Sequence, residues 1–147
     1  MPSQAPIVIS SVVEGLTDEA VLRRILSSLG IVLGPVFGKN GKDWVRKHMR
    51  AYNQAAAQHP WLVVVDLDAD VECAPILVRN WLPQPSRHML FRVAVREVEA
   101  WLLADRKGMA RFLGVPVADL PMKPDSLNDP KGTIVELARR SRQRGIR

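Results

Sequence analysis

The stretch Trp61-Leu62-Val63-Val64-Val65-Asp66-Leu67-Asp68-Ala69-Asp70 decides the fold. Its first five residues are apolar and three of them are valines, a pattern typical of a strand buried on both faces of a sheet. Three aspartates follow at every second position, and an extended backbone places such residues on one face. We therefore predict a central strand over 61–65 that brings Asp66 and Asp68 to one edge of the sheet, joined by Asp70 if the chain stays extended.

Strand and helix patterns alternate along the rest of the chain. Strands are expected at 7–13, 31–37, 61–65 and 89–95, and helices at 17–29, 43–58, 73–82, 97–104 and from 129 onward. Thr17, Asp43 and Asp129 are the expected N-caps of three of these helices. Pro35 indicates that the second strand lies at an edge. The alternation predicts an α/β fold with a mainly parallel sheet and helices on both faces, Rossmann-like, in a single domain of residues 1–147.

The composition is that of an ordinary globular protein, with 147 residues, 47% hydrophobic and 24% charged. Its apolar stretches are far shorter than the roughly 18–20 residues that cross a bilayer, so we expect no membrane partner. Met1-Pro2-Ser3-Gln4 lacks the basic start and apolar core of a secretory signal. Cys73 is the single cysteine and cannot form an intrachain disulfide, so a reducing cytoplasm is the expected location.

The net charge of +6 arises in the second half of the sequence. Residues 71–147 hold fourteen basic and eight acidic side chains, whereas the charges of residues 1–70 cancel. A basic end beside an acidic site favours a protein that processes a polyanion, and a solvated helix face is the alternative. Phosphate contacts are expected from the glycine-containing loop after the second strand and from the basic end: Lys39, Lys42, Lys131, Arg139 and Arg140. The end at 144–147 has no helix cap, as expected for a fragment of a longer protein.

A second acidic motif, Glu14-Gly15, ends the first predicted strand. In an open α/β sheet, ligands bind outside the carboxyl ends of the strands, so Glu14 and Asp66 should face one crevice if their strands are neighbours. Carboxylates that converge repel one another, and a divalent cation offsets the repulsion. Hard oxygen ligands of this kind suit Mg²⁺ or Mn²⁺. We expect Gly15 to let the backbone turn sharply and approach a phosphate closely.

The order of these motifs resembles the TOPRIM domain, the metal-binding fold of topoisomerases, bacterial primases, small RNA-maturing nucleases and OLD-family nucleases. The matching residues are Glu14-Gly15 after one apolar strand and Asp66-Leu67-Asp68 after a second, and the resemblance covers about residues 7–104. It implies that Glu14 binds metal or acts as the acid/base, and that Asp66 and Asp68 are metal ligands.

The segment Glu97-Val98-Glu99-Ala100-Trp101-Leu102-Leu103 is similar to the Glu-x-Trp-Leu-Leu stretch of small TOPRIM-like proteins found near bacterial defence genes. By that similarity, Glu99 is a further acidic site residue. A regular helix would place Glu97 and Glu99 about 200° apart, so only one of them could face a metal, and we favour Glu99. Tyr52 is the only tyrosine and lies in an amphipathic pattern, which indicates packing and disfavours a topoisomerase.

The resemblance implies a Mg²⁺-dependent nuclease that acts on DNA or RNA, with a role in bacterial defence. Its catalytic residues would be Glu14, Asp66 and Asp68, with Asp70 and Glu99 as further metal ligands. A non-catalytic module that binds nucleic acid or protein in a defence or toxin system is an alternative, with a second copy or a defence protein as partner. Asp66-Leu67-Asp68 also resembles the nucleophile motif of haloacid-dehalogenase phosphatases, although Asp70 stands where that family has Thr or Val.

Overall fold

The computed structural model describes residues 5–146, so Met1-Pro2-Ser3-Gln4 and Arg147 lie outside the described part. The chain divides into two compact units. The first contains the residues up to Asp66 together with Val71–Val93, and the second contains Leu67–Asp70 together with the residues from Ala94 onward. The single domain expected for the whole chain stays a prediction, and each unit is described by itself. No described helix is both long enough and apolar enough to span a membrane.

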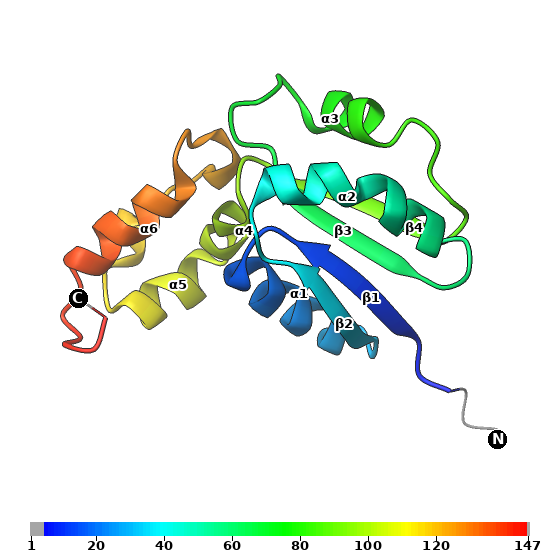
Figure 1. The fold of residues 1–147 in the computed structure, drawn as a ribbon. Helices are drawn as coiled ribbons and strands as arrows, with labels where there is room; N and C mark the ends of the chain where they lie inside the picture. Colours follow the sequence, from blue (N-terminus) through cyan, green and yellow to red (C-terminus); the bar gives the residue numbers. More distant parts are fainter. Residues whose placement is uncertain (1–4, 147) are drawn as a thin grey trace. The chain divides into compact units, whose positions relative to one another are not determined.

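The first unit is built on a four-stranded parallel sheet with the order β2-β1-β3-β4 (Figure 1). Its strands are β1 (Val8–Val13), β2 (Val32–Gly38), β3 (Trp61–Asp66) and β4 (Met89–Ala94). β1 pairs in parallel with β2 on one side and β3 on the other. β4 runs parallel to β3, because the Trp61 amide bonds to the His88 carbonyl and the Leu67 amide to the Ala94 carbonyl at the same offset. The predicted α/β class and the edge position of β2 are therefore confirmed.

Helices cover both faces of this sheet, as predicted. α1 (Leu16–Ser28) lies on one face, and α2 (Lys42–Ala55) and α3 (Ala74–Trp81) lie on the other (Figure 1). This division follows from the strand order, because β2 and β3 flank β1 on opposite sides. Right-handed crossovers in opposite directions place their helices on opposite faces of a sheet.

The core of the first unit lies between the sheet and these helices. Its large fully buried side chains include Val12, Val13, Val45, Val63, Val64, Val65 and Leu77. The Tyr52 ring packs 6.1 Å from the Phe37 ring and 5.2 Å from the Trp61 ring, measured between centroids. Burial raises the pKa of the Tyr52 phenol. Tyr52 is therefore a packing residue between α2 and the sheet, as its sequence context indicated.

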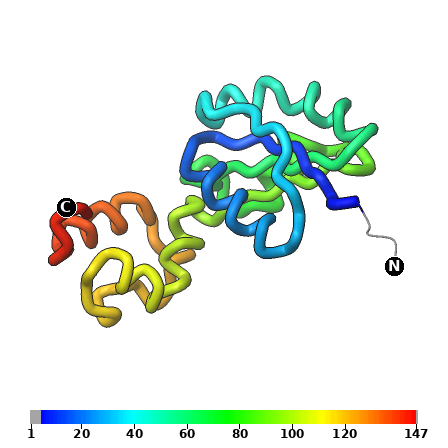
Figure 2. Tube along the Cα trace, turned by 90° about the horizontal axis from the view of Figure 1, so that it is seen from below, coloured from blue at the N-terminus to red at the C-terminus, as the bar shows by residue number. Residues whose placement is uncertain are grey.

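The second unit is mainly helical and forms the yellow-to-red end of the trace in Figure 2. Its helices are α4 (Val98–Ala104), α5 (Arg106–Leu113) and α6 (Pro130–Arg139), with two short 3₁₀ turns, η1 (Val117–Asp119) and η2 (Pro124–Ser126). They enclose a separate core formed by Leu103, Ala110, Leu113, Val115, Leu120 and Leu137.

Two of the three predicted N-caps are wrong. α1 begins after Gly15 and α2 after Gly41, so Thr17 lies inside α1 and Asp43 lies inside α2. At α1 the Asp18 carboxylate accepts the Gly15 amide at 2.8 Å, so the bond runs from the first turn back to the cap. The cap of α6 is confirmed, because the Asp129 carboxylate accepts the Gly132 amide at 2.7 Å.

α5 is absent from the helices expected from the sequence, because Gly108 and Gly114 interrupt the helical pattern there. Gly108 instead lies in the first turn of α5, where its amide donates to the Asp105 carboxylate at 3.0 Å. That carboxylate occupies the space that a Cβ at Gly108 would need. Gly114 has φ of +66° and ends the helix in the left-handed conformation that glycine favours.

Candidate functional site

The ends of β1 and β3 bring Glu14 and Asp66 together. Glu14 directly follows β1, and Asp66 is the last residue of β3. The two strands are neighbours with Val12 opposite Val63, so the register places Glu14 beside Asp66. The Asp66 amide donates a hydrogen bond to Glu14 Oε1 at 2.7 Å, and both residues are half-buried. Both belong to the first unit, where the two strand ends are adjacent as the expectation required.

The connection from Glu14 into α1 is held by the chain itself. Gly15 has φ of −150° and ψ of −176°, an extended conformation that any residue adopts. A Cβ at Gly15 would lie 3.5 Å from its nearest neighbour, Asp18 Oδ2, which is ordinary contact. The sharp glycine turn expected at Gly15 is therefore wrong. Asp18 fixes this connection instead, because the residue is buried and its carboxylate accepts the Gly15 amide.

The loop that follows β2 runs along the end of β1. The Lys39 amide donates to the Val13 carbonyl at 2.8 Å, and the Gly41 amide donates to the Glu14 carbonyl at 3.1 Å. Gly38 is required there, because it has φ of +88° and a Cβ would collide with the Val13 carbonyl oxygen. These bonds place the start of α2, and with it the predicted phosphate ligand Lys42, at the same edge of the sheet as Glu14.

Lys39, a second predicted phosphate ligand, makes an ion pair within this edge. Its Nζ lies 3.0 Å from Glu19 Oε2, and Arg23 lies 2.9 Å from the other oxygen of the same carboxylate. These contacts, first with Lys39 and then with Arg23, lower the pKa of Glu19 below its ordinary value of 4.5. The Lys39 charge is therefore partly balanced by Glu19 at the surface.

The backbone turns at Asp68, so the condition on which Asp70 was expected to share the face of Asp66 is not met. Asp68 has φ of +53°, and the Asp70 amide turns back to the Leu67 carbonyl. Tertiary bonds impose this turn, because the Asp68 amide donates to the Arg96 carbonyl at 3.0 Å and the Arg96 guanidinium donates to the Asp68 carbonyl at 2.7 Å. Residues Leu67–Asp70 belong to the second unit.

The two glutamates near α4 occupy different positions in the second unit. α4 begins at Val98, so Glu97 is its N-cap with φ of −135°, and the 200° helical separation from Glu99 does not apply. Glu97 Oε2 accepts the Lys131 amide at 2.9 Å. The anion at the N-terminus of α6 is therefore the chain's own Glu97. Glu99 lies in the first turn of α4 and is half-buried.

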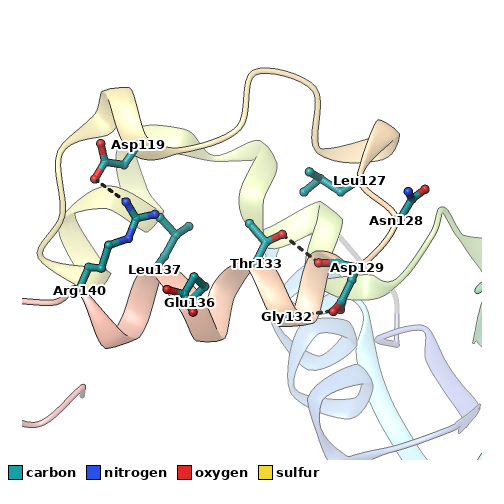
Figure 3. A pocket seen from close by; sticks show the side chains of 9 residues that line it. All are labelled: Asp119, Leu127, Asn128, Asp129, Gly132, Thr133, Glu136, Leu137 and Arg140. Atoms are coloured by element: carbon teal, nitrogen blue, oxygen red, sulfur yellow. Dashed lines mark hydrogen bonds and ion pairs between the residues drawn. The ribbon is translucent and has the colours of Figure 1, made fainter.

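The basic residues of α6 are paired with carboxylates of the same unit. Arg139 lies 3.3 Å from Glu136, and Arg140 lies 3.6 Å from Asp119. Figure 3 shows Arg140, Glu136 and Asp119 around a pocket of about 380 Å³ on α6. Three carboxylates line that pocket, those of Asp119, Asp129 and Glu136, against the one cation of Arg140. This pocket is therefore poorly suited to a phosphate group.

Glu14 and Asp66 offer the kind of ligand that Mg²⁺ takes. Within residues 5–146, no group of three or more His, Cys, Asp or Glu side chains is arranged to hold a metal ion. Mg²⁺ is usually bound by one or two carboxylates, with water and substrate phosphates completing its shell. A pair of carboxylate residues at the carboxyl edge of a parallel sheet fits that requirement. Sequence reasoning missed Asp18, although Gly15 and Asp18 have the three-residue spacing of a capping box.

No family model matches this chain, and the searches of curated proteins and of solved structures gave no match either. The geometry of Glu14 and Asp66 therefore stands alone as the indication of function.

Proposed function

We propose that this protein is a Mg²⁺- or Mn²⁺-dependent enzyme that cleaves phosphodiester bonds of DNA or RNA, of the TOPRIM type. The observation that supports the proposal is the bond from the Asp66 amide to Glu14 Oε1 at 2.7 Å. Two acidic residues that are 52 positions apart in sequence meet there at the carboxyl edge of the sheet. Carboxylates that converge at one edge of a sheet repel each other, and a bound divalent cation would offset that repulsion.

Glu14 and Asp66, both in the first unit, would hold the metal. The bound metal would polarise the scissile phosphate and lower the pKa of an attacking water. The Asp66 amide fixes the orientation of the Glu14 carboxylate and stabilises its negative charge. Asp18 holds the connection that follows Glu14, so the glutamate is positioned from two directions. Lys42, the first residue of α2, would meet a substrate phosphate near this edge.

A cleavage assay with a single substitution tests the proposal. Wild-type protein is incubated with end-labelled single-stranded and duplex DNA and RNA, in Mg²⁺, in Mn²⁺ and in EDTA. We expect cleavage only with a divalent ion, and we expect Asp66→Asn to abolish it. Asn keeps the size of the side chain and the backbone amide that bonds to Glu14. Glu136→Gln is the matched control, because it removes an exposed carboxylate of α6 and should leave cleavage unchanged.

Two results would contradict the proposal. Wild-type protein that cleaves none of the four substrates with either ion is not this nuclease. If the same protein still binds nucleic acid, the non-catalytic module becomes the better description. Cleavage that survives Asp66→Asn would move the active site away from this edge of the sheet.

A further inference from the structure

A basic groove lies in the first unit between α2 and the segment that follows α3. Its volume is about 420 Å³. Three cationic side chains of α2 line it, those of Arg46, Lys47 and Arg50, and no acidic side chain does so. Met49 and Leu82 contribute buried apolar surface to its lining. The groove therefore combines positive charge with an apolar floor.

The wall opposite α2 is held in place by hydrogen bonds. The Asn53 side chain of α2 donates to the Gln84 carbonyl at 2.9 Å and accepts the Ser86 amide at 2.7 Å. Trp81 forms part of that wall, and its ring stacks on the buried Phe91 with 5.9 Å between centroids. The groove is thus largely preformed, which lowers the entropic cost of binding.

The three cations differ from three of the basic residues that were expected to bind phosphate. Lys39, Arg139 and Arg140 each lie within 4.0 Å of a carboxylate oxygen. Within the described residues, Arg46, Lys47 and Arg50 make no ion pair, and the Arg46 guanidinium lies instead over the Trp81 ring, 5.9 Å from its centroid. Clustered cations without carboxylates repel one another, so an external anion would stabilise them. 

The groove is connected through α2 to the acidic edge of the sheet. The N-cap of α2, Gly41, donates its amide to the Glu14 carbonyl at 3.1 Å. Arg46 follows Lys42, the first residue of α2, by about one helical turn, or roughly 6 Å along the axis. A chain of phosphates along α2 therefore leads toward Glu14 and Asp66.

We propose that this groove binds one strand of a nucleic acid, with phosphates at Lys47 and Arg50. An unpaired base takes the place of the Arg46 guanidinium over the Trp81 ring and frees that cation for a third phosphate. The inference rests on the proposed function and narrows its substrate to single strands. A volume near 420 Å³ is that of a small-ligand pocket, too small to admit a duplex. Aromatic rings beside a cationic track are the usual means of binding single strands, because an unpaired base exposes a face for stacking.

Binding without cleavage tests this inference separately from the proposed function. Fluorescence anisotropy is measured in EDTA with labelled oligothymidine and oligouridine of about 12 nucleotides, and with a duplex of the same length. The test variant is Arg46→Gln with Arg50→Gln. The control is Arg23→Gln with Arg24→Gln, which removes the same charge from exposed positions of α1 on the other face of the sheet.

We expect the α2 variant to bind single strands about 10-fold more weakly or worse, and the slope of log K against log salt to fall by about 1.4. The α1 control should bind as the wild type does. Trp81→Leu should weaken binding of single strands and leave weak duplex binding unchanged. Thermal unfolding of each variant checks that the fold is retained, which matters most for Trp81 because it packs on Phe91.

If the α2 variant and the α1 control lose the same affinity for single strands, the groove is not the binding site. If the wild type binds the duplex more tightly than single strands, the single-strand assignment is wrong. Polyglutamate that competes as well as the oligonucleotides would assign the groove to an acidic polypeptide instead. If the wild type cleaves nucleic acid and the α2 variant binds single strands as well as the wild type does, the groove is not the binding site and the proposed function still stands. If the protein cleaves nothing but the α2 variant binds single strands more weakly, the proposed nuclease function is wrong and the assignment of the groove still stands.

Discussion

Glu14 and Glu97 make the same kind of bond in two different settings. Each accepts a backbone amide from a residue far along the chain, Glu14 from Asp66 at 2.7 Å and Glu97 from Lys131 at 2.9 Å. The amide that Glu97 accepts belongs to the N-terminus of α6, where the helix dipole stabilises a negative charge. The amide that Glu14 accepts belongs to a residue with a second carboxylate. The same bond is therefore structural at Glu97, whereas at Glu14 it assembles an acidic pair.

The largest difference between the two glutamates is expected in catalysis. Glu14→Gln should lower the rate of Mg²⁺-dependent cleavage by about 10²- to 10⁴-fold, because the side chain loses its charge. Its amide oxygen can still accept the Asp66 N–H, so the fold should persist. Glu97→Gln, the matched control, should cleave as the wild type does. Single-turnover cleavage assays measure both, and an equal loss in the two variants would show that the settings do not differ in function.

For stability, we expect a clear effect from substitution at Glu97, which has none in catalysis. Glu97→Ala removes the acceptor at the N-terminus of α6 and should lower the free energy of unfolding by about 1 kcal/mol. Glu97→Gln should lose less, since it keeps an acceptor for the Lys131 amide. Urea unfolding followed by circular dichroism measures these changes. Unaltered stability in Glu97→Ala would mean that this bond does not hold α6, and the structural role would be wrong.

A third glutamate, Glu19, sharpens the comparison because it pairs with cations at the surface. Lys39 and Arg23 lower its pKa below 4.5, so the ionised form is favoured in the folded state. Its contribution is therefore present above about pH 4.5 and is lost as the pH falls through the lowered pKa. Lys39→Met should cost less than about 1 kcal/mol at pH 7, because the pair is exposed to solvent.

Urea unfolding of the wild type and Lys39→Met at several pH values measures that contribution. The difference in stability between the two proteins should shrink as the pH is lowered below 4.5. A difference that stays constant down to low pH would show that Lys39 acts through the loop conformation and not through the Glu19 charge.

Much of the fold could be predicted from the sequence, because the strands are marked by local patterns. The apolar run 61–65 is buried on both faces as β3, and the alternation of elements gives the parallel sheet. The meeting of Glu14 and Asp66 then follows, since carboxyl ends of neighbouring parallel strands share one edge. This part of the candidate site needs only the strand ends and their adjacency.

The remainder depends on contacts between residues far apart in sequence. The turn at Asp68 is fixed by the Arg96 backbone and side chain, so no pattern around the aspartates revealed that the extended chain would end. The basic composition of the C-terminal segment likewise gives no sign that Arg140 pairs with Asp119. Charge counts therefore pointed to α6, whereas a cluster of cations without carboxylate partners lies on α2, beside Trp81.

The central claim is that Glu14 and Asp66 bind a divalent cation, and Mn²⁺ binding followed by electron paramagnetic resonance tests it most directly. Free Mn²⁺ gives a strong signal that bound Mn²⁺ loses, so binding is measured without any substrate or cleavage. We predict that the wild type and Glu97→Gln bind Mn²⁺ equally and that Asp66→Asn binds at least about 10-fold more weakly, since it loses a charged ligand. A wild type that leaves the Mn²⁺ signal unchanged, or an Asp66→Asn variant that binds as tightly as the wild type, would contradict the claim.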